Sequence, residues 1–272
     1  MNEALRDFRE RGETVGLVPT MGMLHKGHIS LVKRAVKEND AAVCSIFVNP
    51  TQFNNKEDFN KYPKNIDADL ELLNGAGCQF VFIPDEDQMY PQGAVGESFN
   101  FGTLTKNMEG EFRPGHFQGV ATIVKRLTTL VKPDRSYYGQ KDYQQLLVVK
   151  SLFKQAGFRG EVIGCDILRE DCGLAMSSRN ERLSETDKRK ACFIYECLTD
   201  ARKMLYQSEP RIVEAEIKRR FEQKTDFDLE YFVVADEQTM EPLNHQDYSR
   251  ARIFTAANLA GVRLIDNLKV EE

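Results

Sequence analysis

The hydrophobic and polar positions of the chain alternate between two patterns up to about residue 180. Short apolar runs rich in β-branched and aromatic residues predict strands at 14–19, 41–48, 78–84, 135–139 and 161–168. Longer stretches with apolar residues at helical spacing lie between them and predict helices at 28–38, 67–73, 119–131 and 142–156. Strands that are apolar throughout and alternate with helices are typical of a parallel sheet covered on both faces.

The pattern changes after the segment "MSSRNERLSETDKRK". Two charged amphipathic helices are predicted at 184–207 and 211–223, followed by apolar runs at 228–236 and 251–270 that predict antiparallel strands, with a turn near Ala260 and Gly261. We therefore expect an α/β fold with a Rossmann-like parallel sheet and helices on both its faces. The larger domain is expected at 1–178, and a smaller C-terminal α+β domain at 179–272.

Composition narrows the classes of protein to consider. The chain has 272 residues, is 41% hydrophobic, and carries 37 Lys and Arg against 42 Asp and Glu, a net charge of −5. This balance argues against a general nucleic-acid or membrane-surface binder. The charged N-terminus lacks an apolar signal core, no run of apolar residues is long enough to span a membrane, and we expect a cytoplasmic protein.

Six cysteines are scattered along the chain without a CxxC pair. Several of them lie in apolar runs, where a small buried thiol is the usual interpretation. The sequence therefore predicts neither disulfides nor a structural zinc site.

Candidate chemistry begins in the stretch "LVPTMGMLHKGHISLVKRA" at 17–35, where a predicted strand gives way to a helix. Gly22 and Gly27 permit a tight backbone path there. Free backbone N–H groups at a helix start attract anions, and the imidazoles of His25 and His28 add hydrogen-bond donors. This arrangement suits nucleotide phosphates.

Two other interpretations of the stretch stay open when it is considered alone. His25 could be a surface loop residue and His28 a helix cap. A metal site is a weaker alternative, because two histidines three residues apart need further ligands and no HExxH-like partner is present.

Four further blocks are rich in polar side chains, and three of them have a structural interpretation on their own. A capped turn explains "GQKD", a polar loop "SSRN", and a turn set by proline and glycine "RPGHF". Asp69 lies outside these blocks, and its spacing alone makes it a helix-surface acid. The blocks are "SIFVNPTQF" (45–53), "RPGHFQGVATIV" (113–124), "YYGQKDYQQL" (137–146) and "GLAMSSRN" (173–180).

Taken in order with "PTMGMLHKGH", these blocks resemble the pantothenate synthetase (pantoate–β-alanine ligase) family, within the nucleotidylyltransferases that carry an HxGH motif. The resemblance implies a ligase of pantothenate and coenzyme A biosynthesis. It would condense (R)-pantoate with β-alanine at the expense of ATP, through a pantoyl adenylate, giving pantothenate, AMP and pyrophosphate. It also implies Mg²⁺ accompanying ATP, a homodimer, a C-terminal lid domain, and no nucleic-acid or membrane partner.

The resemblance assigns roles residue by residue. His28 is implied as the proton donor or transition-state stabiliser, and His25 and Lys141 as further catalytic residues. Implied ATP-binding residues are Met21, Gly22, Met23, Leu24, His25, Lys26, Gly27, His28, Gly139, Gln140, Lys141, Asp142, Leu168, Met176, Ser177, Ser178 and Arg179. By the resemblance, Asp69 matches a position discussed near magnesium in this family, but no protein ligand of Mg²⁺ is implied with the same clarity.

A small acid with two hydroxyl groups calls for amide side chains, which both donate and accept hydrogen bonds. By the resemblance, Gln52 and Gln145 bind pantoate, and Gln52 also borders the β-alanine site. The choice of Gln145 over the adjacent Gln144 rests on the resemblance alone.

Two other functions compete with a ligase. One is an HxGH enzyme that leaves the nucleotidyl group on a phosphate-bearing product, which should lack the glutamines of "NPTQF" and "YQQL". The other is a nucleotide-binding regulatory protein without catalysis, which the combination of His25, His28, Lys141, Ser178 and Arg179 argues against.

Overall fold

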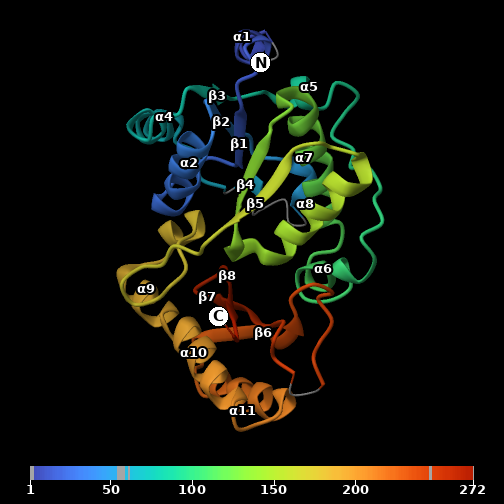
Figure 1. Ribbon diagram of the computed structural model, residues 1–272. Coiled ribbons are helices and arrows are strands. Elements are labelled where there is room, and N and C mark those ends of the chain that lie inside the picture. The colour runs from blue at the N-terminus through green and yellow to red at the C-terminus, as the bar shows by residue number, and fades with distance from the viewer. Residues whose placement is uncertain (1–2, 54–58, 61, 245–246, 272) are drawn as a thin grey trace. The chain divides into compact units, whose positions relative to one another are not determined.

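The computed structural model describes residues 3–53, 59–60, 62–244 and 247–271 (Figure 1). The chain divides into two compact units, each built from more than one segment. The first unit is Met1–Phe101, Arg113–Gln140 and Gln145–Asp166, and the second is Gly102–Phe112, Lys141–Gln144 and Ile167–Glu272.

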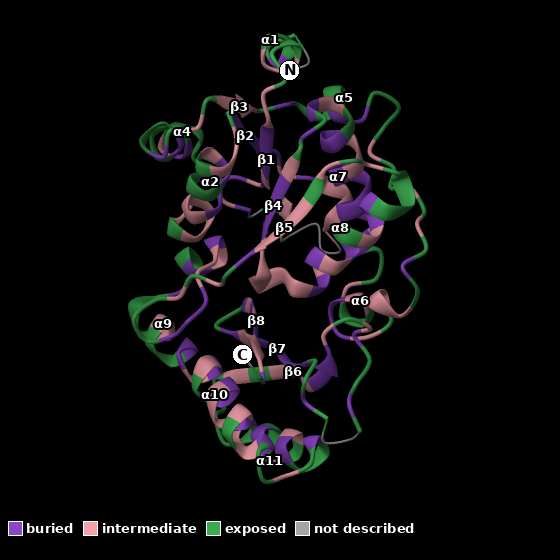
Figure 2. Ribbon diagram, viewed as in Figure 1, coloured by how far each residue is buried: buried purple, intermediate pink, exposed green. Residues whose placement is uncertain are grey.

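The first unit is built on a parallel sheet with the strand order β3-β2-β1-β4-β5. The strands are β1 (Val15–Thr20), β2 (Ala41–Ile46), β3 (Phe80–Phe82), β4 (Arg135–Gly139) and β5 (Glu161–Cys165). Every residue of β2 is buried, as expected for an inner strand covered on both sides (Figure 2). The predicted Rossmann-like sheet is confirmed.

Helices cover both faces of this sheet (Figure 1). On one face lie α2 (Lys26–Glu38) and α4 (Ile66–Gly75), and on the other α7 (His116–Val131) and α8 (Tyr143–Ala156). Shorter elements of the first unit are α1 (Arg6–Glu10), the 3-10 turn η1 (Pro50–Gln52) and α5 (Glu86–Met89), and η3 (Gln140–Asp142) follows β4. Helix α2 buries Leu31, Val32 and Ala35 in a core shared with Val18 and Cys44 of β1 and β2.

The second unit contains an antiparallel sheet in the order β6-β7-β8. Its strands are β6 (Phe227–Asp236), β7 (Ala251–Leu259) and β8 (Val262–Lys269). The turn predicted near Ala260 and Gly261 joins the last two strands, and both residues have positive φ. Its other elements are η2 (Gly102–Thr105), α6 (Glu109–Phe112), η4 (Ser178–Arg182), α9 (Glu185–Ala191), α10 (Phe193–Leu205) and α11 (Pro210–Glu222). Helices α10 and α11 share an apolar core with the sheet.

A buried carboxylate explains why Gly102–Phe112 belongs to the second unit. Glu109 of α6 accepts hydrogen bonds from the Tyr231 hydroxyl at 2.8 Å and from two guanidinium nitrogens of Arg263 at 2.6 and 2.9 Å. Its paired, buried charge fastens this excursion of the chain to β6 and β8.

Three expectations differ from the structure. The segment Ile167–Ser178 groups with the second unit, so the division falls near residue 166 and not at 178–179. The single helix predicted at 184–207 is interrupted at Cys192, where the Tyr195 N–H bonds the carbonyl three residues back. A disulfide joins Cys172 to Cys192, although none was predicted; a turn brings the two Cα atoms to 5.7 Å across 20 residues of sequence.

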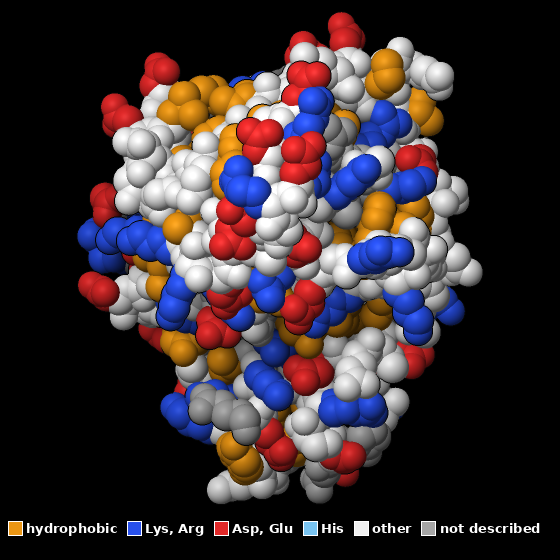
Figure 3. All heavy atoms as spheres, turned by 45° about the horizontal axis from the view of Figure 1, so that its top comes forward, with side chains coloured by type: hydrophobic (Ala, Val, Ile, Leu, Met, Phe, Trp, Pro, Cys, Tyr) orange, Lys and Arg blue, Asp and Glu red, His pale blue; other side chains and the backbone are white. Residues whose placement is uncertain are grey.

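Charged side chains of both signs are interspersed on the face drawn in Figure 3. This distribution agrees with the small net charge of the sequence and shows no large field of one sign on that face. Within the described residues, no helix is both long enough and apolar enough to cross a membrane.

Candidate active site

The first group of predicted site residues lies where the strand order of the first unit reverses. Strands β1 and β4 are neighbours, with Gly16 opposite Arg135 and Leu17 opposite Ser136. The segments that follow them, Met21–His28 and Gly139–Gln140, leave the same edge of the sheet. Ligands of open α/β sheets bind at this edge, outside the carboxyl ends of the strands.

Side chains occupy most of the backbone donors in the loop after β1. The Gly22 N–H bonds the Thr20 hydroxyl at 3.2 Å, and the N–H groups of Met23 and Leu24 donate to the two carboxylate oxygens of Asp69 at 2.9 and 2.6 Å. These three N–H groups of the loop that leads to the helix are therefore engaged by side chains of the protein itself. Asp69 is also not a helix-surface acid, since only 2% of it is exposed.

The two histidines of the motif cap the helix and fix each other. Helix α2 begins at Lys26, with His25 as its N-cap. His25 Nδ1 accepts from the Gly27 N–H at 3.1 Å, and His28 Nδ1 accepts from the His25 N–H at 3.4 Å. An Nδ1 atom that accepts leaves the proton of the neutral ring on Nε2, so both imidazoles are Nε2–H donors. The ring centroids are 4.1 Å apart.

Gln52, at the end of η1, is held through both its side chain and its backbone. Its amide nitrogen contacts the Met21 sulfur at 2.7 Å, and its amide oxygen accepts from the buried Asn49 at 3.2 Å. The backbone oxygen of Gln52 lies 2.9 Å from His116 Nδ1 and accepts from Arg113 at 3.4 Å. "RPGHF" is thus more than a turn, because it supports the residue predicted to bind both small substrates.

Helix α7 approaches η1 closely at Gly119. Asn49 donates to the Gly119 carbonyl at 3.1 Å, and a Cβ atom at Gly119 would lie 2.2 Å from the Thr51 carbonyl oxygen. Only glycine fits a backbone contact this tight.

The two adjacent glutamines at the start of α8 differ in their burial and in their hydrogen bonds. Gln144 is 4% exposed; its amide donates to the carbonyls of Leu104 and Asn107 and accepts from the Glu109 N–H. The amide of Gln145 is partly exposed and has no hydrogen-bond partner within the described part of the chain. Gln144 is therefore structural, and Gln145 retains the capacity to bind a ligand.

Lys141 and Asp142 belong to the second unit. The Lys141 ammonium lies 3.7 Å from the Asp142 carboxylate, and 17% of the Lys141 side chain is exposed. The Lys141 carbonyl accepts from the Asn267 side chain at 2.9 Å, which ties this turn to β8. Burial raises the pKa of the adjacent Asp266 carboxyl, although its ion pair with Arg169 opposes the shift.

Residues 168–176 form a hairpin-like turn that leads into "SSRN". The Met176 N–H bonds the Leu168 carbonyl at 3.0 Å, and Arg169 pairs with Asp266 through both guanidinium nitrogens at 2.6 and 2.9 Å. Ser177 then caps η4, accepting from the Arg179 N–H at 3.3 Å. A predicted ATP loop is thus anchored to β8 from its N-terminal side.

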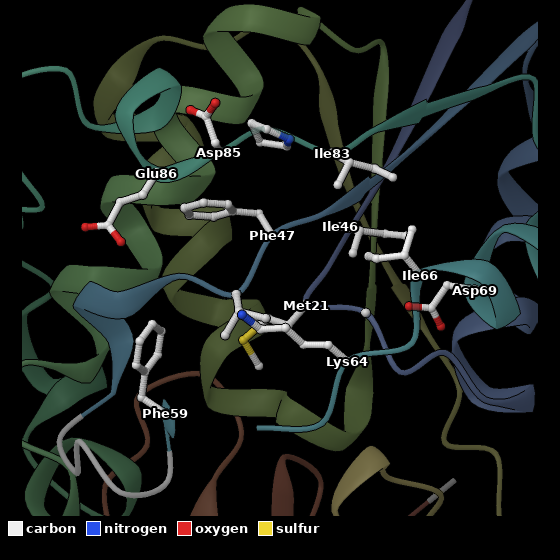
Figure 4. Close-up of a pocket in the computed structure, with 13 residues that line it drawn as sticks. Met21, Ile46, Phe47, Phe59, Lys64, Ile66, Asp69, Ile83, Asp85 and Glu86 are labelled. Carbon is white, nitrogen blue, oxygen red and sulfur yellow. The ribbon is translucent and has the colours of Figure 1, made fainter. Parts of the chain in front are cut away.

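A cavity of about 240 Å³ opens beside the loop after β1, a size sufficient for a small ligand or several waters (Figure 4). Met21, Gly22 and Asp69 form part of its wall. The remaining lining residues are Ile46, Phe47, Val48, Phe59, Lys64, Ile66, Ile83, Pro84, Asp85 and Glu86.

Comparison with known proteins shows the family to which the chain belongs. The family model described as Pantoate-beta-alanine ligase matches residues 1–269. The chain belongs to this family. A curated relative, the pantothenate synthetase of Christiangramia forsetii, is 43% identical over 268 residues, 98% of this chain and 95% of that protein. The pantothenate synthetase of Bacteroides thetaiotaomicron is 44% identical over 269 residues, with the same coverage.

Solved structures of pantoate–β-alanine ligases share the fold. The pantothenate synthetase of Thermus thermophilus superposes with a TM-score of 0.91 at 41% identity, covering 98% of each chain. The pantoate–β-alanine ligase of Francisella tularensis, solved in complex with beta-gamma ATP and beta-alanine, gives a TM-score of 0.81 at 36% identity, covering 99% of this chain and 96% of that one.

The residues expected from this ligase family fall into two sets in the structure. The first unit holds Met21–His28, Gln52, Gly139, Gln140 and Gln145, and the second holds Lys141, Asp142, Leu168 and Met176–Arg179. Their roles toward ATP, pantoate and β-alanine stay predictions. Sequence reasoning missed the residues that hold them in place, namely Thr20, Asn49, Asn267 and the buried role of Asp69.

Proposed function

We propose that this pantoate–β-alanine ligase works in two steps. A carboxylate oxygen of pantoate attacks the α-phosphorus of ATP and displaces pyrophosphate, giving pantoyl adenylate. The β-alanine amine then attacks the acyl carbon, loses a proton and displaces AMP, giving pantothenate. The observation that carries this proposal is the pair of imidazoles at the switch point of the sheet, each with Nδ1 engaged by a backbone N–H and Nε2–H as its donor.

The histidine pair suits attack at phosphorus. Negative charge grows on the phosphoryl oxygens and on the leaving pyrophosphate, so positioned donors and cations matter more than a nucleophilic side chain. His28 stabilises the transition state and His25 assists it. Rings fixed by their own helix start need no rearrangement as that charge develops.

The second unit contributes the cation and the loop for the distal phosphates. Lys141 is a point charge suited to a phosphate, and Ser177, Ser178 and Arg179 supply two hydroxyls and a guanidinium for the β- and γ-phosphates. The remaining ATP contacts come from Met21–His28, Gly139, Gln140, Asp142, Leu168 and Met176. Anchoring of the Lys141 carbonyl by Asn267 supports this assignment.

Two glutamine side chains, those of Gln52 and Gln145, bind pantoate. Gln145, with its amide available, and Gln52, held beside Met21, bind the hydroxyl and carboxylate groups of pantoate. Gln52 also borders the β-alanine position. The Francisella relative, which binds beta-gamma ATP and beta-alanine, supports both nucleotide and amine as ligands of one fold.

Magnesium enters as part of the MgATP substrate. Both carboxylate oxygens of Asp69 already accept backbone N–H groups, which makes this acid a poor ligand for the ion. Among the described residues there is no group of three or more His, Cys, Asp or Glu side chains placed to hold a metal. An ion carried by the phosphates needs no dedicated protein cage.

We also propose that the enzyme is cytoplasmic and homodimeric. ATP is a substrate supplied inside the cell, which supports the location. The dimer rests on the family resemblance and is tested by sedimentation equilibrium. A monomer across the working concentration range would refute it.

The test of the function is pantoate-dependent release of pyrophosphate from MgATP. With β-alanine present we expect stoichiometric pantothenate and AMP, and without it an adenylate that stays bound to the protein. Pyrophosphate release that requires a phosphorylated acceptor, with the nucleotidyl group kept on the product, would identify a nucleotidylyltransferase instead. Binding of ATP with no pyrophosphate release under any of these conditions would indicate a regulatory protein.

A further inference from the structure

Asp69 makes a contact that the family resemblance does not explain. It lies in the first turn of α4, is almost fully buried, and accepts backbone hydrogen bonds from Met23 and Leu24, residues 46 and 45 positions earlier. Its carboxylate points from α4 toward the loop that carries Met21 (Figure 4). One side chain of α4 therefore holds two successive N–H groups of a loop that is distant in sequence.

The loop is shaped to receive this carboxylate. Met23 has a φ of 49°, a left-handed backbone conformation that a non-glycine residue keeps only when surrounding contacts hold it. A Cβ atom at Gly22 would lie 2.9 Å from the Asp69 oxygen and 3.1 Å from the Ile46 side chain, so the backbone here must be glycine for α4 to approach.

The contact lies one residue before the histidine pair. Leu24, bound by Asp69, precedes His25, whose N–H bonds His28 and whose ring caps α2. A shift of the Met23–Leu24 backbone is therefore transmitted directly to the position of both imidazoles.

We propose that Asp69 is a positioning residue for adenylate formation. Its carboxylate fixes the loop after β1 so that His25 and His28 face the reacting phosphate, while Asp69 itself touches no substrate. The inference rests on the function proposed above, and it assigns to α4 a role in the chemistry that no motif of the sequence indicates.

The test compares Asp69→Asn with Asp67→Asn. Both changes remove one negative charge from the first turn of α4, but Asp67 is exposed and, within the described part of the chain, makes no hydrogen bond to the loop. In Asp69→Asn the amide oxygen replaces one acceptor, whereas the NH₂ group faces the second N–H and breaks that bond. Because displacement of catalytic groups by about 1 Å costs roughly a hundredfold, we expect kcat for pantoate-dependent pyrophosphate release to fall by about 10- to 100-fold. The KM for pantoate should change little, and Asp67→Asn should match the parent.

Hydrogen–deuterium exchange provides a readout that does not depend on activity. Exchange at Met23 and Leu24 should accelerate in Asp69→Asn and stay at the parental rate in Asp67→Asn. A double-mutant cycle with His28→Ala should be strongly non-additive, because both changes remove the same placed donor.

Different outcomes would refute the positioning role of Asp69 and the proposed ligase function. Unchanged exchange in Asp69→Asn, or faster exchange with parental kcat, would overturn the positioning role. Additive effects of Asp69→Asn and His28→Ala on kcat would do the same, since a merely destabilised fold acts independently of the histidine. A parent protein without pantoate-dependent pyrophosphate release would overturn the proposed function, and with it the catalytic part of this inference.

Discussion

Replacing Gly119 by alanine tests whether the close approach of α7 to η1 places Gln52. The new Cβ would lie 2.2 Å from the Thr51 carbonyl oxygen, while ordinary contact begins near 3.4 Å, so the helix and η1 must separate by about 1.2 Å. The same Cβ would lie 2.7 Å from Gln52 Cα, so the displacement reaches the residue proposed to bind pantoate directly.

The magnitudes favour a loss of activity over a loss of folding. Overpacking costs about 1–3 kcal/mol, and the better helix propensity of alanine recovers about 1 kcal/mol, so the protein should stay folded. A displacement of this size at a substrate-positioning residue costs roughly a hundredfold in kcat/KM. The assay is pyrophosphate release at saturating ATP with pantoate varied.

Gly75→Ala is the matched control. It makes the same chemical change in a helix of the same unit, where a Cβ would meet nothing within 4 Å. We expect Gly75→Ala to keep parental kinetics and Gly119→Ala to lose kcat/KM for pantoate while still binding ATP. Parental kcat/KM in Gly119→Ala would show that η1 can move without harm, and the placement of Gln52 by α7 would be refuted.

Four further outcomes are expected. His28→Ala should slow adenylation by roughly a hundredfold or more, because it removes a preorganised donor from developing charge; an unchanged rate of pyrophosphate release would refute that role. Gln145→Ala should raise the KM for pantoate more than the KM for ATP, and equal effects on both KM values would contradict the assignment of Gln145 to pantoate. Gln144→Ala should instead lower thermal stability, because it removes the hydrogen bonds to Leu104, Asn107 and Glu109. Burial raises the pKa of Glu214, so the stability that this carboxyl contributes is fully present below its unfolded-state pKa and is lost as pH rises through its folded-state pKa. In urea titrations at several pH values, Glu214→Gln should be more stable than the parent above the folded-state pKa and equally stable below the unfolded-state pKa. Cys172→Ser, measured by denaturant unfolding without reductant, should lose about 3 kcal/mol, the value for a 20-residue loop, and a loss equally large in dithiothreitol would show that the disulfide is not its source.

The strands of both sheets could be predicted because they are recognisable from their apolar composition. Continuous apolar runs such as 41–46 are buried on both faces, and helical spacing separates them. The turn at Ala260 and Gly261 could be predicted for the same reason, since local chemistry determines it. Boundaries were less predictable: nothing in the periodicity of 184–207 marks the interruption at Cys192, which accompanies a contact with Cys172 from outside the helix.

The site residues with recognisable motifs could be located, but their supports could not. Asp69 looks like an ordinary acid in the first turn of an amphipathic helix, and its burial depends on a loop 45 residues away. The adjacent Gln144 and Gln145 have identical chemistry, and only the three-dimensional contacts of Gln144 tell them apart. Long-range hydrogen bonds of single side chains leave no periodic trace in one sequence.

The last strand has a consequence for how the protein is made. Asn267 in β8 holds the Lys141 carbonyl, and Asp266 beside it binds Arg169 ahead of the "SSRN" segment. During synthesis, residues 141–179 leave the ribosome long before these two partners exist. The nascent chain therefore carries the segments predicted to bind ATP before it has the strand that anchors Lys141 and Arg169. A chain stalled on the ribosome before residue 266 should therefore lack both anchors, and the turns around Lys141 and Arg169 should become ordered only after β8 has been made.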